Sequence, residues 1–254
     1  MSAFEQFHLK QILQKVSTET GVEVSEANYW QVRQRIHLLC KKHSIPSFYA
    51  LRQHIQSNQK YIFWDELLEC VLVKESYFFR DSLFFKRLEQ EIIPPLLRYH
   101  SPIRIWSAAT AQGQEIYSIA MMGHKANILG EMELYASDIS QDALQSAQEG
   151  LYSYNSLRRS ICHEDIPLFF YEHQKKWRFR DDIRKQVSFF RHNLLHPCNK
   201  KHYYHIIIIK NMLMYLSPEN RRKVIQKAQL ALHNDGILII SNPNTQILKK
   251  DSTL

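Results

Sequence analysis

The first 73 residues have the hydrophobic spacing of amphipathic helices. Apolar side chains recur at intervals of three and four, as at Val32, Ile36 and Leu39. Gly21 and Pro46 separate these helical stretches, because glycine and proline interrupt regular backbone hydrogen bonding. The pattern therefore predicts a small all-helical N-terminal domain over residues 1–73.

Beyond residue 95, short apolar runs alternate with stretches of helical spacing. The runs that predict strands are residues 103–107, 134–137, 206–209 and 237–241. The third run is all isoleucine, which is typical of a central strand buried on both faces. Helices are predicted between the strands, at residues 115–122 and 141–149. Strands that alternate with helices indicate a parallel sheet with right-handed crossovers, so we predict an α/β domain from residue 74 to residue 254.

The last predicted helix of this domain has a marked start and end. Ser217 stands at the N-cap, Pro218 at the first helical position and Glu219 in the first turn. Gly236 is expected to close this helix before the strand at residues 237–241, because glycine often follows the last helical turn.

A small antiparallel β insert is predicted at about residues 171–190. Residues 177–180 and 186–190 are rich in β-forming side chains and flank a charged turn at residues 180–185. The stretch at residues 171–188 contains no glycine, the residue that most readily adopts positive φ. We therefore expect the insert to be structural rather than shaped to clasp a peptide strand.

Composition narrows the class of protein. No apolar run approaches the roughly 20 residues that cross a bilayer, and the N-terminus lacks the pattern of a signal peptide, so we expect a cytoplasmic protein without membrane insertion. The formal charge of +8 favours an acidic partner without saying whether it is nucleic acid, membrane or protein. The four cysteines form no CxxC pair and the histidines no HExxH motif, so no disulfide framework and no metal site are predicted.

Candidate chemistry lies just after the first two predicted strands, where ligands bind in open parallel sheets. Gly113 is the only glycine in the first loop, so this loop matches the GxGxxG dinucleotide motif poorly. The helix that opens at Gln114 offers amide donors to an anionic group. Asp138 follows the second strand, where a carboxylate can accept hydrogen bonds from both ribose hydroxyls of an adenosine cofactor. The alternative is that Asp138 caps the helix at residues 141–149.

Five motifs in order resemble those of the CheR-type chemoreceptor methyltransferases. WSAATAQGQEIYSIAM at residues 106–121 resembles the family's WSA…TGEEPYSIAM, and KESYFFRD at residues 74–81 resembles NETxFFRD. ASDIS, FFRHNLLHP and KNMLMY are similar to the family's ATDI(D/S), FxxxNLL and RNVLIY. The helical N-terminal part also resembles the family's, through VRQRIHLLCKKHSIPSF at residues 32–48.

This resemblance implies a Rossmann-like domain that methylates glutamate carboxylates on the cytoplasmic helices of a chemoreceptor. It implies S-adenosylmethionine as the cofactor and S-adenosylhomocysteine as the product. By similarity, the residues that line the cofactor pocket are Ser76, Arg80, Gly113, Glu115, Asp138, Asn193, Leu194 and Lys210. Arg80 and Tyr215 are implied to flank the reacting methyl group as the catalytic pair. Without the motifs, Arg80 would be interpreted as a surface ion pair with Asp81, and Tyr215 as a packing aromatic.

A basic helix in the N-terminal domain is the expected docking surface for an acidic receptor helix. Its cationic residues are Arg33, Arg35, Lys41 and Lys42. The alternative is an ordinary solvated helix face. Because the β insert lacks glycine, we expect the methyl-accepting receptor to be captured without a C-terminal pentapeptide tether.

Several positions depart from the family pattern. Lys74 replaces Asn, Lys210 replaces Arg and His205 replaces Asp, while residues 242–244 read NPN in place of HSE. The chain stops at Leu254, where the family continues for about one β-hairpin, so the sheet is expected to lack its terminal antiparallel pair.

The departures leave two alternatives to a receptor methyltransferase. One is a catalytically impaired relative that binds the cofactor or a protein and acts as a regulatory module. The other is a nucleic-acid methyltransferase, suggested by the basic charge and by NPNT at residues 242–245, a partial match to the base-holding NPPY motif. No nucleic-acid partner is expected, because that motif follows the wrong strand.

Overall fold

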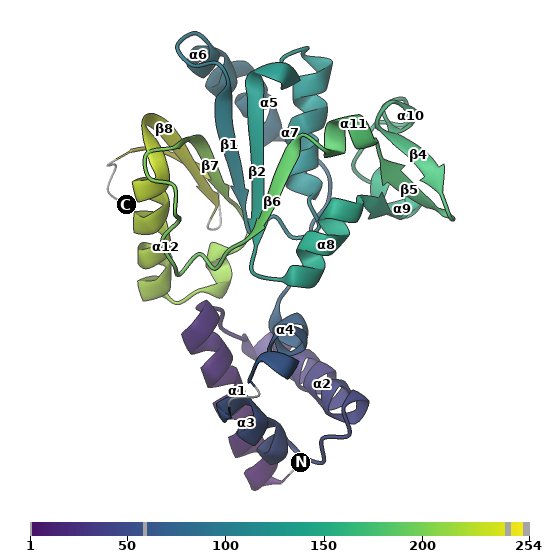
Figure 1. Cartoon of the computed structure of the whole chain (residues 1–254), viewed down its shortest axis with the longest axis vertical. Helices are drawn as coiled ribbons and strands as arrows, with labels where there is room; N and C mark the ends of the chain where they lie inside the picture. Colours follow the sequence, from purple (N-terminus) through teal and green to yellow (C-terminus); the bar gives the residue numbers. More distant parts are fainter. Residues whose placement is uncertain (1, 58–59, 242–244, 251–254) are drawn as a thin grey trace. The chain divides into compact units, whose positions relative to one another are not determined.

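The computed structural model describes residues 2–57, 60–241 and 245–250 (Figure 1). The chain forms two compact units, of which one comprises Met1–Val73 with Met214–Lys223 and the other Lys74–Leu213 with Val224–Leu254. Within the described residues, no helix is both long and apolar enough to cross a membrane. The NPN sequence at residues 242–244 lies outside the described residues.

The first unit is helical, as the spacing of apolar residues predicts. Its long helices are α1 (Ala3–Thr20), α2 (Glu26–Lys42), α3 (Phe48–Gln56) and α4 (Lys60–Val71). Leu9, Ile36 and Leu51 come from three of these helices and are all fully buried. They belong to the apolar positions spaced three and four residues apart, because only one face of each helix is turned toward the core.

The second unit is built on a six-stranded sheet with the order β6-β2-β1-β7-β8-β9. The strands are β1 (Ile103–Ala108), β2 (Met132–Asp138), β6 (Val187–Arg191), β7 (Tyr204–Ile209), β8 (Leu232–Ser241) and β9 (Thr245–Lys249). All neighbouring pairs are parallel except β8 and β9. The predicted α/β class with a parallel sheet and a helical N-terminal part is confirmed.

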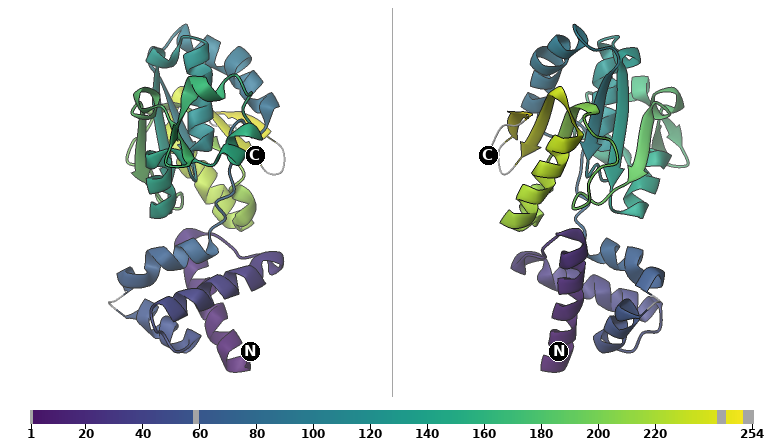
Figure 2. Two further views of the ribbon diagram at one scale, coloured as in Figure 1. Left: turned by 90° about the vertical axis from the view of Figure 1, so that its right-hand side faces the viewer. Right: turned by 60° about the vertical axis from the view of Figure 1, so that its left-hand side comes forward.

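Helices cover both faces of this sheet (Figure 2). They are α5 (Ser82–Arg87), the π-helix η1 (Leu88–Ile92), α6 (Ile93–Leu97), α7 (Gln114–Lys125), the 3-10 helix η2 (Leu129–Glu131), α8 (Gln141–Glu149) and α12 (Pro218–Ala231). Ile206 and Ile208 of β7 join the core that includes residues of α5, α6 and α7, whereas the intervening Ile207 is fully buried outside that core. The all-isoleucine strand is therefore covered on both faces, because successive side chains of a strand point to opposite sides.

The β insert differs from the prediction in its strands and its turn. A separate three-stranded antiparallel sheet has the order β3-β5-β4, with β3 (Leu151–Tyr152), β4 (Phe170–His173) and β5 (Lys176–Phe179). The predicted second strand is instead β6, which pairs in parallel with β2 in the main sheet. The predicted charged turn is the short helix α11 (Asp181–Arg184), which the Arg184–Asp181 ion pair at 2.9 Å stabilises. Two further short helices, α9 (Tyr154–Arg158) and α10 (Ile166–Phe169), flank this sheet (Figure 1).

The absence of glycine does not keep the insert from left-handed backbone conformations, and the expectation that the insert is structural stays a prediction. Gln174 and Lys175 form the turn between β4 and β5, with φ of 47° and 63°. Both residues adopt the left-handed conformation that two-residue hairpin turns require, although neither is glycine. Other contacts of the hairpin therefore outweigh the local cost, and the absence of glycine carries no argument about peptide binding.

Two expectations about the C-terminal part are wrong. The last helix ends at Ala231 rather than at Gly236, which lies within β8 where the pairing with β7 shifts register. A Cβ at Gly236 would come within 2.7 Å of Leu232 Cγ, so close packing explains this glycine. The expected absence of an antiparallel pair is also contradicted, because β9 pairs antiparallel with β8 from Ile237–Lys249 to Ser241–Thr245.

Candidate functional site

The central sheet brings several loops together at the carboxyl ends of its parallel strands. The chain moves from β1 to β2 and then β6 on one side, and returns to β7 and β8 on the other. The order reverses between β1 and β7, and such a switch point is where open α/β sheets bind their ligands. The end of β2 and the segments after β1 and β6 carry five of the eight predicted pocket residues, namely Gly113, Glu115, Asp138, Asn193 and Leu194.

Asp138 at the end of β2 links two of these loops. Its Oδ1 accepts the Ser140 N–H and its Oδ2 accepts the Ala111 N–H, each at 2.9 Å. Burial raises the pKa of Asp138, whereas these amides and the charge of Lys74 oppose the rise. The alternative that Asp138 caps α8 is wrong, because the Ser140 side chain accepts the Ala143 N–H as the cap. A carboxylate has about four acceptor positions, and the backbone amides of Ser140, Ala111 and Ile139 do not fill all of them, so Asp138 can still accept from a ligand.

The loop from β1 to α7 has an unusual backbone. Ala109, Ala111 and Gly113 have φ of 60°, 51° and 86°. At Gly113 the structure requires glycine, because a Cβ would lie 3.0 Å from both the Ala147 Cβ and the Tyr117 ring. Gly113 has no side chain that could cap α7, so the N-terminal amides of this helix are available to an anionic group.

Glu115 lies in the first turn of α7 and is half-buried. Ser107 of β1 donates a hydrogen bond from Oγ to Glu115 Oε1 at 2.8 Å, which positions the carboxyl group. Burial raises the pKa of Glu115, while the Ser107 hydrogen bond and the charges of Lys210 and Arg80 oppose the rise. A negative carboxylate at this point suits a cationic ligand group such as an amine.

Lys210 follows β7 and forms an ion pair with Asp81 at 2.8 Å. The Lys210 side chain is only 2% exposed and its Nζ lies 3.8 Å from the centre of the Phe84 ring. Asp81 also accepts the Phe84 N–H and the Thr245 hydroxyl. The alternative interpretation of Arg80 as an ion pair with Asp81 is therefore not what the structure shows. Lys210 replaces the family's Arg as a cation that Asp81 holds in place.

Arg80 and Lys210 border one cavity of about 550 Å³ in the second unit. The charged groups that line it are Arg80, Asp81, Arg87 and Lys210. Arg80 donates from Nη1 to the Glu75 carbonyl at 3.2 Å, and its Cζ lies 5.3 Å from the centre of the Tyr77 ring. More cationic side chains than carboxylates line the cavity, since Asp81 is the one acidic residue among the lining residues named, so the cavity suits an anionic group.

The remaining predicted pocket residues are divided between two segments. Ser76 is half-buried in the segment that precedes Arg80, and Leu194 is buried after β6. Asn193 Oδ1 accepts the Leu195 N–H at 3.0 Å, which ties down its own loop. Asn193 lies close in sequence to His192, whose N–H donates to the Asp138 carbonyl at 2.9 Å. The loops that carry Asn193 and Asp138 are therefore neighbours at one edge of the sheet.

Tyr215 and the predicted docking residues belong to the first unit. Tyr215 ends the 3-10 helix η3 (Leu213–Tyr215), and its carbonyl accepts the Glu23 N–H at 2.8 Å. Arg80 belongs to the second unit, so its pairing with Tyr215 at one methyl group stays a prediction.

The four docking residues do not share one face of α2. At about 100° per residue, Arg35 and Lys42 point in nearly the same direction, while Arg33 and Lys41 point to the other side. Lys42 is paired with Glu66 at 2.7 Å, and the Nε of Arg33 is buried. Arg35 and Lys41 are exposed.

Sequence reasoning missed the residues that support the site. Ser107 positions Glu115, the Ala111 amide binds Asp138, and Asp81 holds Lys210. Ser107 and Asp81 belong to the motifs WSA and FFRD, so their presence in a motif was the available signal. The histidine spacing along the chain also failed to reveal that His100, His205 and His233 meet at the amino ends of the strands.

Comparison with known proteins identifies the family. The family model described as the SAM-binding domain of CheR methyltransferase matches residues 74–252. A chemotaxis protein methyltransferase of Vibrio parahaemolyticus is 27% identical over 231 residues, which cover 89% of this chain and 84% of that protein. One of Listeria monocytogenes is 26% identical over 234 residues, covering 92% and 87%.

Solved structures give weaker similarities. A SAM-dependent methyltransferase of Methanosarcina mazei is 15% identical with a TM-score of 0.36, covering 58% of this chain and 56% of its own. A glycopeptide N-methyltransferase complexed with sinefungin is 12% identical with a TM-score of 0.37, covering 60% and 48%. These matches span less than two thirds of either solved chain. On the family model and the curated relatives, the chain belongs to the CheR methyltransferase family.

Proposed function

We propose that the chain transfers a methyl group from S-adenosylmethionine to glutamate side chains on the cytoplasmic helices of a chemoreceptor. The family match over residues 74–252 carries this proposal. The geometry supports it, because Glu115 lies in the first turn of α7 and Asp138 at the end of β2, while Arg80 and Lys210 border a cavity whose cations suit a carboxylate.

The donor groups at the strand ends fit the cofactor. Asp138 offers its remaining acceptor positions to ribose hydroxyls, and Glu115 offers a carboxylate to the amino group of the methionine part. The uncapped N-terminus of α7 offers amides to the cofactor carboxylate. Ser76, Gly113, Asn193, Leu194 and Lys210 complete the proposed pocket.

The chemistry requires alignment more than proton transfer. When bound, S-adenosylmethionine would supply an electrophilic methyl group on a sulfonium: a carboxylate oxygen would bond to the methyl carbon as the carbon–sulfur bond breaks, and S-adenosylhomocysteine would leave with that electron pair. A glutamate substrate is already ionised near neutral pH, so the chain has no proton to remove. Arg80 binds the incoming carboxylate with its planar fork, and Tyr215 orients it through the phenol hydroxyl. The impaired-relative alternative is not favoured, because both residues are present.

Receptor docking is proposed for the first unit. Arg35, Lys41 and Lys42 are exposed on α2, Lys42 is paired with Glu66, and Arg35 and Lys41 face different directions on the helix. An acidic receptor helix therefore contacts one side of α2 at a time. We propose that this capture operates without a pentapeptide tether, because β4 has only four residues and offers a peptide few unpaired backbone groups.

The test is methyl transfer to a receptor cytoplasmic fragment, measured as base-labile methyl ester released as methanol. Cofactor binding is measured separately by calorimetry with S-adenosylhomocysteine. Asp138→Asn keeps the size of the side chain and removes its charge, so we expect binding roughly 10- to 100-fold weaker. Asp142→Asn is the matched control, because Asp142 is an exposed acid on the adjoining helix.

Two results would contradict the proposal in different ways. Unchanged binding in Asp138→Asn would remove Asp138 from the pocket without affecting the assignment of the family. Tight binding of the product by a wild-type protein that methylates no receptor fragment from its own host would favour the regulatory module over the enzyme.

A further inference from the structure

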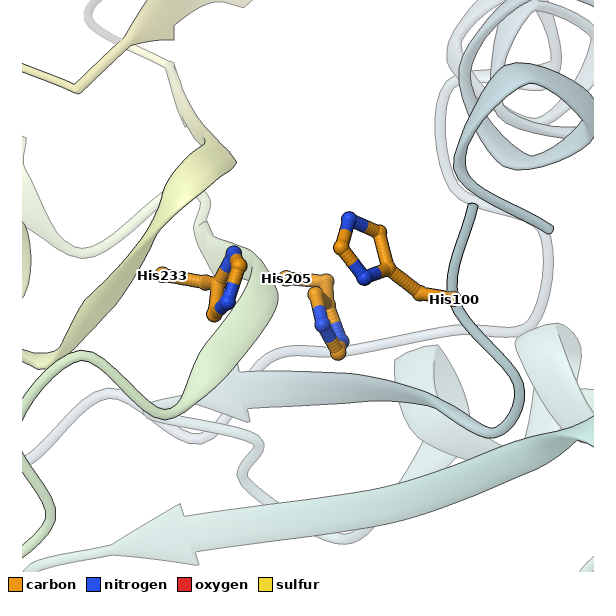
Figure 3. Close-up of side chains that lie close together, drawn as sticks. All are labelled: His100, His205 and His233. Carbon is orange, nitrogen blue, oxygen red and sulfur yellow. The ribbon is translucent and has the colours of Figure 1, made fainter. Parts of the chain in front are cut away.

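Three histidines that are far apart in sequence gather at the amino ends of the central strands. His100 lies just before β1, His205 is the second residue of β7 and His233 is the second residue of β8. Figure 3 shows the three rings close together, with the His100 and His205 rings stacked at 4.5 Å between their centres. Asp138 lies at the carboxyl end of β2, so this cluster occupies the opposite edge of the sheet from the cofactor residues.

We propose that His100, His205 and His233 bind a divalent transition-metal ion of the zinc class, with Asp235 as the fourth ligand. One ring nitrogen from each histidine lies within 4.8 Å of the others. In a tetrahedral zinc site the nitrogens are about 3.3 Å apart, because each lies about 2.0–2.1 Å from the metal. Contraction to that geometry moves each nitrogen by roughly 1 Å, and it requires the His100 and His205 rings, which are stacked with centroids 4.5 Å apart, to turn their nitrogens toward one point.

Asp235 adds the charge and the fourth donor that such a site needs. Its Oδ2 lies 3.6 Å from His100 Nε2 and 4.0 Å from His233 Nδ1. The Asp235 side chain is 72% exposed and therefore has room to approach a metal. Three imidazoles and one carboxylate make a borderline donor set, which suits Zn²⁺ or Co²⁺ better than Mg²⁺ or Ca²⁺.

Burial and neighbouring charges shift the pKa of two of these rings. Burial, the charge of Arg104 and the neighbouring histidines lower the pKa of His205 to about 4. Burial and the charge of His100 lower the pKa of His233 as well, although Asp235 opposes this.

Arg104 opposes metal binding and therefore limits the affinity of the site for the metal. Its backbone N–H donates to His205 Nδ1 at 2.9 Å, and its Nη2 lies 3.3 Å from His205 Nε2. A neutral imidazole has one lone pair, so it cannot accept from both donors. The guanidinium also donates from Nε to the Tyr203 carbonyl at 2.7 Å. His205 must exchange contacts with Arg104 for the metal, and the positive charge repels a cation, so we expect micromolar rather than nanomolar affinity.

The metal would act as a structural clamp rather than in methyl transfer. It would link the segment before β1 to β7 and β8, and β8 pairs with the edge strand β9. A ligand that binds only the folded state raises the unfolding temperature by mass action. We therefore expect Zn²⁺ to increase thermal stability and to leave cofactor binding unchanged.

The experiment titrates metal-free full-length protein with Co²⁺ and follows the visible d–d absorption, with Zn²⁺ as competitor. Wild type should bind Co²⁺ with a dissociation constant below about 50 μM. Nitrogen and oxygen ligation lacks the intense near-ultraviolet band of a cobalt thiolate, which separates this site from the free cysteines Cys162 and Cys198. His100→Ala and His233→Ala should each weaken binding at least tenfold and abolish the zinc-dependent rise in unfolding temperature.

Two further variants make the test more specific, and neither changes a residue of the proposed catalytic machinery. His37→Ala removes an exposed histidine of α2 and should bind Co²⁺ like wild type. Arg104→Gln removes the repelling charge and should tighten binding several-fold. The proposal is overturned if wild type shows no d–d band up to about 1 mM Co²⁺, or if His100→Ala and His233→Ala bind as tightly as His37→Ala. It is also overturned if Arg104→Gln weakens binding in a folded protein.

Discussion

The ion pair between Asp81 and Lys210 can be tested by a nearly isosteric change. Asp81→Asn removes the charge and keeps a side-chain oxygen that can accept the Phe84 N–H. Asp81 has φ of 69°, a left-handed conformation that asparagine tolerates as well as aspartate does. The substitution therefore isolates the electrostatic contribution from capping and backbone strain.

The expected loss follows from the burial of the two partners. Removing one member of a fully buried pair costs about 3–5 kcal/mol, because the other charge is left unpaired. The Lys210 side chain is 2% exposed but that of Asp81 is 35% exposed, so solvent screens part of the interaction. We expect Asp81→Asn to lower the free energy of unfolding by about 2 kcal/mol. In a chain of this size, this corresponds to a fall of roughly 4–8 °C in unfolding temperature.

The pH dependence of this loss has a definite sign. Burial alone raises the pKa of Asp81, but hydrogen bonds from Lys210, Thr245 and the Phe84 amide outweigh it, so the pKa is lowered. A lowered carboxyl pKa stabilises the folded state above the unfolded pKa of about 3.9, and this stabilisation is lost as pH falls through the folded value. The difference between wild type and Asp81→Asn should be constant from about pH 5.5 to 8 and shrink below about pH 4.

The assay is urea unfolding of a double-mutant cycle, followed by tryptophan fluorescence because Trp106 is buried in the sheet. Lys210→Met keeps an aliphatic side chain packed on Phe84 and removes the charge. The double variant Asp81→Asn/Lys210→Met should be more stable than Asp81→Asn alone. We expect a coupling energy above about 1 kcal/mol. A value below about 0.5 kcal/mol, or a loss that does not change with pH, would refute this account of the pair.

Three further predictions concern activity and recognition. Arg80→Ala should reduce methyl transfer roughly 10- to 100-fold, and Tyr215→Phe should reduce it by a smaller factor. Both variants should keep the circular dichroism spectrum of the wild type. Full activity in both variants would show that neither residue takes part in catalysis. Raising salt from about 50 to 300 mM should weaken receptor binding and not cofactor binding, because exposed charges such as Arg35 and Lys41 are screened; equal salt dependence would argue against docking on α2. A peptide ending in NWETF should bind more weakly than about 10 μM, and tighter binding in calorimetry would show that the hairpin or another surface captures a tether.

Local patterns in the sequence determined the class of fold and the position of most elements. Apolar runs predicted β1, β2, β7 and part of β8, because buried strands need apolar residues on both faces. The start of α12 was predicted equally well, since the Ser217 hydroxyl accepts the Asn220 N–H at 3.2 Å. The motifs and their place after strands were enough to indicate Glu115 and Asp138 as site residues, because loops at strand ends carry ligand-binding groups.

Interactions between distant segments determined what the sequence could not show. The strand at Val187–Arg191 joins the main sheet because β2 offers it a parallel edge, and local β propensity cannot distinguish this from a hairpin. Gln174 and Lys175 form the hairpin turn because the pairing of β4 with β5 outweighs their poor turn propensity.

The same limit applies to the charged and ligand-like groups. Asp81 meets Lys210, which is 129 residues away, and the sheet brings His100, His205 and His233 together although their spacing matches no ligand motif. Each side chain can be read from the sequence, but its partner depends on strand order and register, which only the packed sheet decides.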